Sequence, residues 1–180
     1  MSESILQEVR RAYVPKLPPV FAENGMNVTV VDGEITLPEF DTDKIQELFP
    51  NTCGLPIITF QAGANETHQV VNVGVILSGG QAPGGHNVIA GIFDGLKALN
   101  PDNKLYGFLG GPSGLIDNEY MELTTEIIDE YRNTGGFDMI RSGRTKLETE
   151  PDFDKVKINC DTLGVNAIVI IGGDDSNTNA

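Results

Sequence analysis

The clearest pattern in the sequence begins near residue 70, where short apolar segments recur along the chain. Residues 70–77, 105–109 and 167–171 are nearly continuous apolar runs, and two of them are rich in Val and Ile. The first run is typical of a strand that is covered on both faces. Together the runs predict three strands.

The segments between these runs carry helical signals. Apolar residues at helical spacing predict a helix over residues 88–99, which the Asn100-Pro101 pair ends. Thr124 or Thr125 is a suitable cap for a helix through Arg132, and a further helix is expected over residues 152–163. Strand, crossover helix and strand in repetition predict an α/β domain with a Rossmann-like, mostly parallel sheet and helices on both faces.

Residues 1–70 lack this alternation. We interpret them as an N-terminal extension that precedes a domain over residues 71–180. A helix is expected near residues 5–12, a strand over residues 28–31 that ends at the Asp32-Gly33 turn, and a helix over residues 43–49. No motif in this part carries chemistry, so we expect it to pack on the main domain or on a partner subunit.

The charge balance narrows the function classes. A net charge of −14 argues against binding to nucleic acid or to anionic membranes, since both need a surplus of Lys and Arg. No apolar run approaches the roughly 20 residues that cross a bilayer, and the N-terminus does not resemble a secretion signal. The two cysteines, Cys53 and Cys160, are far apart and are expected to be reduced thiols. A soluble, cytoplasmic protein is expected.

Two of the predicted strands are followed by glycine pairs. The first is followed by Gly79-Gly80 within the loop Ser78–Gly85, and the last by Gly172-Gly173. In a parallel sheet, ligands bind outside the carboxyl ends of the strands, and glycine there lets main-chain N–H groups approach an anion. The loop is neither a Walker A motif nor a GxGxxG motif. Glycines that serve only turn geometry and packing are the alternative interpretation.

Charged residues near these loops suggest how an anion would be held. Asp174 and Asp175 directly follow the last glycine pair, and paired carboxylates beside a phosphate site are suited to Mg²⁺. Arg141–Lys146 concentrates three of the twelve basic residues, which makes Arg144 and Lys146 candidates for an anion clamp. A solvated acidic turn and an exposed basic loop are the alternatives. His68 and His86 have no metal-ligand spacing, and His86 is expected at a helix start beside the glycine loop.

Three stretches in this order resemble the phosphofructokinase superfamily. They are the loop Ser78–Gly84, the basic turn around Arg144, and the strand end Gly172-Gly173-Asp174-Asp175-Ser176. The resemblance covers about residues 70–180, and the extension before it resembles that of the long, pyrophosphate-using bacterial and plant-type members. It implies an enzyme that phosphorylates fructose 6-phosphate reversibly, with pyrophosphate as donor and Mg²⁺ as cofactor.

The resemblance also implies roles for individual residues. Gly79, Gly80, Gly173 and Ser176 would contact the diphosphate together with Arg144 and Lys146, and Asp174 would face the metal. ATP-using members carry glycine where this chain has Asp175. A carboxylate there would occupy space and repel charge where the α-phosphate of ATP must lie, so Asp175 is expected to select pyrophosphate.

The family's general base lies in a segment downstream of the Gly-Gly-Asp motif, beyond Ala180, and so does the sugar-phosphate site. We therefore expect these 180 residues to be an N-terminal fragment that does not turn over alone, from an enzyme that is a homodimer. An ATP-dependent 6-phosphofructokinase and a non-catalytic phosphate-binding regulatory domain are the alternative interpretations.

Overall fold

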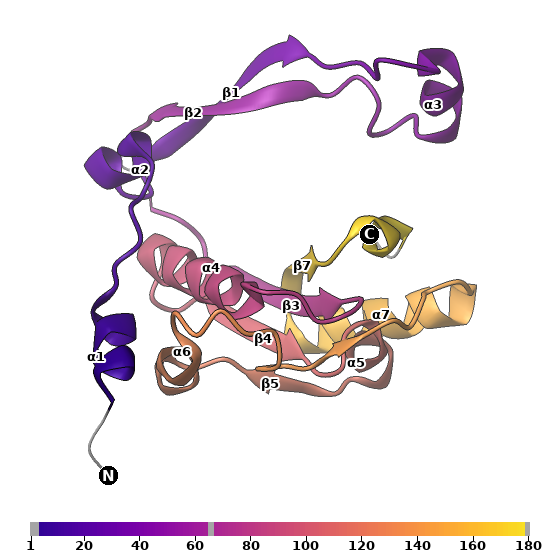
Figure 1. Cartoon of the computed structure of the whole chain (residues 1–180). Coiled ribbons are helices and arrows are strands. Elements are labelled where there is room, and N and C mark those ends of the chain that lie inside the picture. Colours follow the sequence, from indigo (N-terminus) through magenta and orange to yellow (C-terminus); the bar gives the residue numbers. More distant parts are fainter. Residues whose placement is uncertain (1–3, 65–66, 179–180) are drawn as a thin grey trace. The chain divides into compact units, whose positions relative to one another are not determined.

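The computed structural model describes residues 4–64 and 67–178 (Figure 1). The chain divides into two compact units, one formed by Met1–Pro15 with His68–Ala180 and the other by Lys16–Thr67. Most of the predicted extension therefore forms the smaller unit. Its first helix instead belongs with the larger unit, where the Asn133 side-chain amide donates hydrogen bonds to the carbonyls of Arg10 and Tyr13, both 3.0 Å long.

The larger unit alternates strands and helices as expected. In chain order its elements are α1 (Ile5–Ala12), β3 (Asn72–Ser78), α4 (Gly85–Leu99), β4 (Lys104–Phe108), α5 (Pro112–Asp117), β5 (Tyr120–Glu122), α6 (Thr125–Tyr131), β6 (Ser142–Gly143), α7 (Glu150–Leu163), β7 (Val165–Ile171) and the 3-10 helix η1 (Asp174–Thr178). All the strands and helices predicted after residue 70 are confirmed, with ends shifted by a few residues. The sequence did not predict the short elements α5, β5 and β6.

Strand β3 lies at the centre of the sheet. It pairs in parallel with β4 through Val75 and with β7 along its whole length, while β5 adds an antiparallel edge beside β4. Leu77 pairs with Ile171 of β7 and also with Ser142 of β6. Because a strand residue has only two sides, β6 must take the side that β4 leaves after Val75. The predicted mostly parallel sheet is confirmed.

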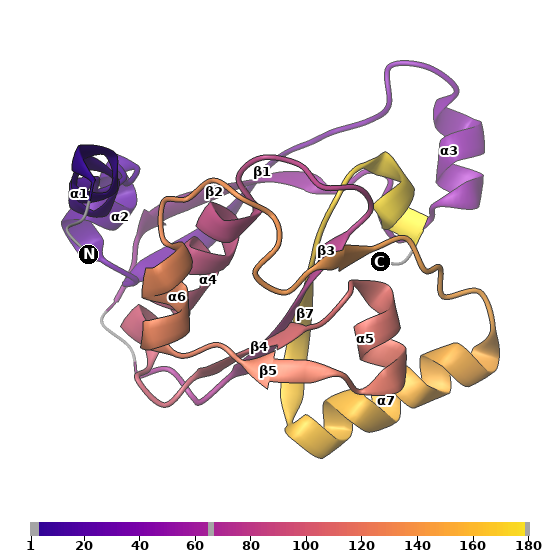
Figure 2. The same ribbon diagram turned by 60° about the horizontal axis from the view of Figure 1, so that its bottom comes forward.

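Helices cover both faces of this sheet, as the sequence predicted. Val73, Val75 and Leu77 of β3 pack in one apolar cluster with α4 and α6. Ile76 points to the other face, into a cluster with Leu115 of α5 and with residues of α7. Helices α5 and α7 lie side by side in that layer (Figure 2). Because successive side chains of β3 are buried on opposite faces of the sheet, its sequence is apolar at nearly every position.

The smaller unit is an antiparallel hairpin with two short helices. Strand β1 (Val28–Ile35) pairs with β2 (Pro56–Ala62), α2 (Pro19–Asn24) packs on β2 through Phe21 and Phe60, and α3 (Thr42–Leu48) lies in the connection between the strands. The expected end of the first strand at Asp32-Gly33 is wrong, because the strand continues there through a shift in register between Asp32 and Ile35. Pro19 is the first residue of α2, where its missing N–H needs no partner in the first turn.

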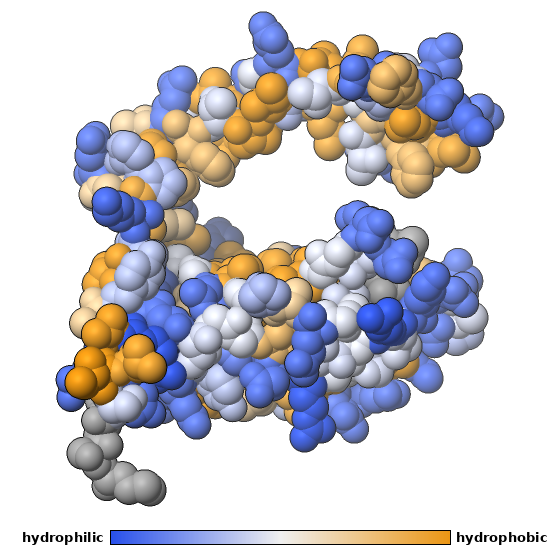
Figure 3. Space-filling model, viewed as in Figure 1, coloured by the Kyte–Doolittle hydropathy of each residue, from blue (hydrophilic) through white to orange (hydrophobic). Residues whose placement is uncertain are grey.

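Hydrophobic side chains lie on the surface of the smaller unit (Figure 3). Those that are exposed on the hairpin and its connection are Val30, Ile35, Leu37, Phe40, Leu48, Phe49, Leu55, Ile57, Ile58 and Phe60. The expectation that this part of the chain packs on the main domain or on a partner subunit stays a prediction. Among the helices that the structure describes, none is both long and apolar enough to cross a membrane.

Candidate phosphate-binding site

The carboxyl ends of β3 and β7 are neighbours in the sheet, so their two glycine loops face a common space. A pocket of about 550 Å³ lies there. Its lining includes Gly79, Gly80, Gly173, Asp174 and Asp175, together with Arg144 and Ser176. The motifs that the sequence singled out separately therefore lie together at one edge of the sheet.

The loop after β3 needs glycine for its backbone conformation. Gly79 and Gly84 both have φ of +96°, a region that side chains with a Cβ rarely adopt. The N–H of Gly79 donates to the carbonyl of Gly143 over 2.7 Å, which ties the start of the loop to β6. Within the described part of the chain, the N–H groups of Gly80 and Gly173 donate to no protein acceptor, so both are available to an anion.

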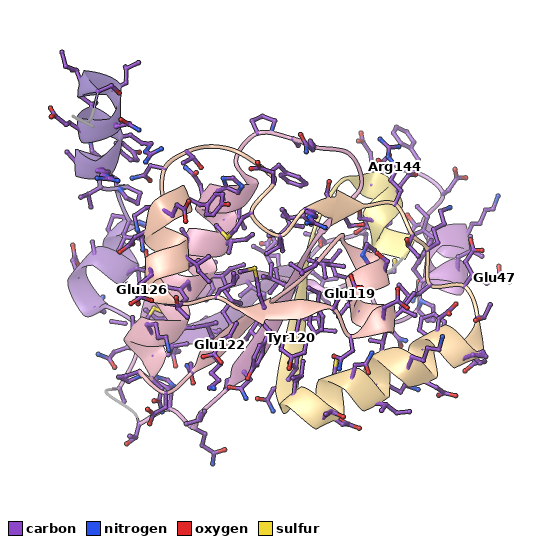
Figure 4. All side chains as sticks on the ribbon, turned by 90° about the horizontal axis from the view of Figure 1, so that it is seen from below. Glu47, Glu119, Tyr120, Glu122, Glu126 and Arg144 are labelled. Atoms are coloured by element: carbon purple, nitrogen blue, oxygen red, sulfur yellow. The ribbon has the colours of Figure 1, made fainter. Side chains whose placement is uncertain are left out.

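Arg144 reaches the pocket because β6 pairs with the last residues of β3. Its guanidinium lies over Gly80, where a Cβ would come within 2.7 Å of Nη2. Arg144 and Lys146 also line a smaller adjoining pocket of about 200 Å³ with Asp175 and Ser176. Figure 4 shows Arg144 near the C-terminal segment that carries these residues.

The charge of Arg144 is available to a ligand. Neither Arg144 nor Lys146 forms an ion pair within residues 4–64 and 67–178. Arg132, in contrast, is held by Asp94 and Asp129 at 2.7 Å and 2.9 Å, and hydrogen bonds to these carboxylates raise the pKa of its guanidinium further. In so acidic a chain, two basic side chains without carboxylate partners at a glycine loop favour an anionic ligand.

The segment after β7 contributes two kinds of side chain. Asp174 and Asp175 are exposed at the start of η1 and line the pocket. Ser176 is 6% exposed, and its hydroxyl donates to the carbonyl of Ser78 over 3.4 Å. A Cβ at Gly172 would overlap the Ser176 hydroxyl. Ser176 therefore connects the end of β3 to the end of β7, and its predicted contact with the diphosphate stays a prediction.

The carboxylates fit a metal that is held jointly with a phosphate ligand. In the part of the chain that the structure covers, no three His, Cys, Asp or Glu side chains gather as an all-protein metal site. Mg²⁺ commonly takes only one or two carboxylates and completes its shell with water and phosphate oxygens. Asp174 and Asp175 supply that number of carboxylates beside available main-chain N–H groups.

The pocket also has an apolar wall that the sequence did not indicate. Val88 of α4 and Phe137 line it together with the charged residues. Phe137 packs on Gly85 so closely that a Cβ at Gly85 would overlap its ring. Phe137 lies in a stretch without strand or helix signals, so only the folded chain brings it to the glycine loop.

Comparison with known proteins agrees with this geometry. The family model described as phosphofructokinase matches residues 72–180, a range that contains the whole pocket. The chain belongs to the phosphofructokinase family. Of the solved structures, Pichia pastoris phosphofructokinase in the T-state aligns over 83% of this chain and 18% of that one, with a TM-score of 0.51. At 21% identity it supports the phosphofructokinase fold alone.

Two curated members of the family match the whole chain. The Porphyromonas gingivalis protein named pyrophosphate–fructose 6-phosphate 1-phosphotransferase is 55% identical over 181 residues, which cover 100% of this chain and 32% of that protein. The protein of the same name from Entamoeba histolytica is 49% identical, with 100% of this chain and 33% of that protein covered. The chain thus spans about a third of the length of these relatives.

Proposed function

We propose that this chain forms the phosphoryl-donor half of a pyrophosphate-dependent phosphofructokinase. The enzyme transfers a phosphoryl group reversibly between pyrophosphate and the 1-hydroxyl of fructose 6-phosphate. One observation carries the proposal: glycine-loop N–H groups, two basic side chains and two carboxylates line this pocket and the smaller pocket that adjoins it. The names of the two full-chain relatives support the same donor and acceptor.

The protein groups hold the donor by charge and by hydrogen bonds. The main chain at Gly79, Gly80 and Gly173 lies against the diphosphate, Arg144 and Lys146 neutralise its oxygens, and Ser176 lies beside them. Asp174 would hold Mg²⁺, which would supply positive charge beside the transferring group. Phosphoryl transfer needs little covalent help from the protein, so positioning and electrostatic stabilisation are the main contributions of this half of the site.

Asp175 selects the donor in this proposal. Asp175 is exposed and lines both pockets, so its carboxylate would repel the further phosphate of a nucleotide triphosphate that is bound there. Placing two like charges together costs several kcal/mol. Pyrophosphate lacks that further phosphate and avoids the repulsion.

The proposal includes the assembly and location expected from the sequence. The enzyme acts as a homodimer in the cytoplasm, and the 180-residue chain binds the donor without turnover. Both cysteines are free thiols, which supports a reducing compartment. An ATP-dependent enzyme is less well supported because of Asp175. A regulatory domain would not require the carboxylates beside the anion cradle.

Donor binding to the chain tests the proposal. Isothermal titration should show that Mg²⁺–pyrophosphate binds more tightly than Mg²⁺–ATP. The Asp175→Gly variant should narrow that preference by about tenfold or more, since each factor of ten is about 1.4 kcal/mol. Asp174→Asn is the matched control, and it should weaken both donors alike. A chain that binds neither donor, or an Asp175→Gly variant with unchanged preference, would contradict the proposal.

A further inference from the structure

His86 is buried immediately behind the glycine loop and has no place in the donor site described above. It is the second residue of α4 and is 2% exposed. Its Nδ1 lies 2.6 Å from the Thr134 hydroxyl, and its Nε2 accepts from the N–H groups of Asp138 and Met139, both 2.9 Å away. Both ring nitrogens are therefore occupied by hydrogen bonds.

These partners determine the protonation state of the ring. The Thr134 hydroxyl donates to the carbonyl of Tyr131 over 2.6 Å, so it accepts the bond from Nδ1. Nε2 faces two N–H donors, and a proton there would oppose both. The ring is thus neutral, with its proton on Nδ1.

The charged neighbours do not change this assignment. An oxygen of Asp138 lies 3.0 Å from Nε2, but that carboxylate is 72% exposed and can turn into water, whereas the two main-chain donors are fixed. Tyr131 packs edge-on against the ring, with the centroids 4.9 Å apart. Burial lowers the pKa of His86 below its ordinary value of 6.5, although the Asp138 carboxylate opposes the shift.

The bonds of His86 join the two segments that line the pocket. The N–H of Gly84 donates to the carbonyl of Gly135 over 2.8 Å, and the N–H of His86 donates to that of Gly136 over 2.9 Å. At the other end of the loop, Gly79 donates to Gly143. Residues 79–86 and 135–143 are thus tied at both ends, with Phe137 from the second segment and the following Arg144 lining the pocket between them.

We propose that neutral His86 is a positioning residue for the donor pocket: by accepting from the N–H groups of Asp138 and Met139, it fixes the distance between the glycine loop and the segment that carries Phe137 and Arg144. The identity of the donor rests on the proposed function, but the structural role does not. A proton on Nε2 would displace that segment and open the pocket.

The first test observes the ring itself. The chain has two histidines, so ¹⁵N-histidine NMR of the wild type and of a His68→Gln variant assigns the His86 nitrogens. At pH 7.5 we expect a protonated Nδ1 and a bare Nε2. A proton on Nε2, alone or in a doubly protonated ring, overturns the proposal.

The second test compares two substitutions at the same position. The amide oxygen of His86→Gln can accept from the main-chain donors and does not titrate near neutrality, whereas His86→Leu offers no acceptor. Titration with Mg²⁺–pyrophosphate at pH 8 should show affinity within about threefold of wild type for Gln and about a tenfold loss for Leu. A folded Leu variant that binds as the wild type does overturns the proposal.

The pH profile separates positioning from general stability. Because the folded pKa is lowered, the favourable contribution of His86 is complete above about pH 6.5 and declines as the pH falls through the lowered value. Wild-type affinity should therefore fall relative to His86→Gln as the pH falls through that lowered pKa; parallel profiles across this range overturn the proposal. If His86→Leu does not fold, this comparison of the wild type with His86→Gln tests the proposal in its place. Because pyrophosphate titrates equally in both experiments, its own protonation cancels in the comparison.

The experiment also separates this proposal from the proposed function. If the wild-type chain does not bind pyrophosphate, the proposed function fails. The role of His86 is then decided by its tautomer and by hydrogen exchange at Asp138 and Met139. Faster exchange at both amides in the wild type below pH 6.5, relative to His86→Gln, supports the role, and equal exchange contradicts it.

Discussion

Replacing Gly80 with alanine should weaken donor binding without weakening the fold. Gly80 does not have a positive φ, so its backbone accepts alanine. The atoms that a Cβ at this position would meet belong to the guanidinium of Arg144, with Nη2 at 2.7 Å and Cζ at 3.7 Å. The guanidinium is the far end of a flexible side chain, so it can move aside.

The size of the effect follows from that displacement. Ordinary contact with a Cβ begins near 3.4 Å, so Nη2 must move by about 0.7 Å or more. Charge-assisted hydrogen bonds are about 2.7–2.9 Å long, and a shift of this size exceeds their tolerance. Losing such a bond entirely costs about 1.5–3 kcal/mol, and partial loss about 1 kcal/mol, or roughly fivefold in affinity. The unfolding free energy should stay the same or rise by about 0.4–1 kcal/mol, because alanine restricts the unfolded chain.

Isothermal titration with Mg²⁺–pyrophosphate and urea denaturation together measure both quantities. Gly91→Ala is the matched control, since Gly91 is exposed on α4 and a Cβ there would meet nothing within 4 Å. In an Arg144→Ala background, Gly80→Ala should cause no further loss. Equal affinity of Gly80→Ala and wild type would refute the placement of Arg144. An undiminished effect in the Arg144→Ala background would show that Gly80 acts through its main chain instead.

Two further substitutions test the glycine loop and its connection to the end of β7. Gly79→Ala should lower the unfolding free energy by about 1–2 kcal/mol because the φ of Gly79 is +96°. The effect comes from the backbone, since a Cβ there would meet only the Ser176 hydroxyl, at 3.9 Å. Urea denaturation measures the loss, and an unchanged midpoint would contradict the prediction. Ser176→Ala should cost about 1 kcal/mol by removing the bond to the Ser78 carbonyl, and an unchanged unfolding free energy would show that this bond contributes nothing.

The sequence predicted the elements whose apolar pattern is long enough to identify them. β3 and β7 are continuous apolar runs, and α4 has both helical spacing and a stop signal, so each was predictable from local residues. β6 has only two residues and no apolar pattern. It lies where Gly143 approaches the loop after β4 so closely that a Cβ at Gly143 would overlap the carbonyl of Gly110. That is a long-range condition, which no local pattern expresses.

The same distinction applies to the site. The two glycine pairs could be placed together from sequence because parallel strands bring their carboxyl ends to one edge. The contact of Arg144 with Gly80 could not, because it depends on β6 pairing with β3. The burial of Ser176 could not be predicted from the sequence either. A serine after two aspartates reads as part of a solvated turn, and only the approach of β7 to β3 buries it.

The bonds that hold this pocket together come from groups without charge. Main-chain hydrogen bonds join Gly79 to Gly143 and Gly84 to Gly135, and the Ser176 hydroxyl and the neutral His86 ring supply further connections. Arg144 and Lys146 reach the pocket without carboxylate partners among the described residues. Under the proposed function, their attraction to a diphosphate would act without first breaking an ion pair to a described residue. In a chain with a net charge of −14, such a separation of structural from binding groups would let two basic side chains favour an anion.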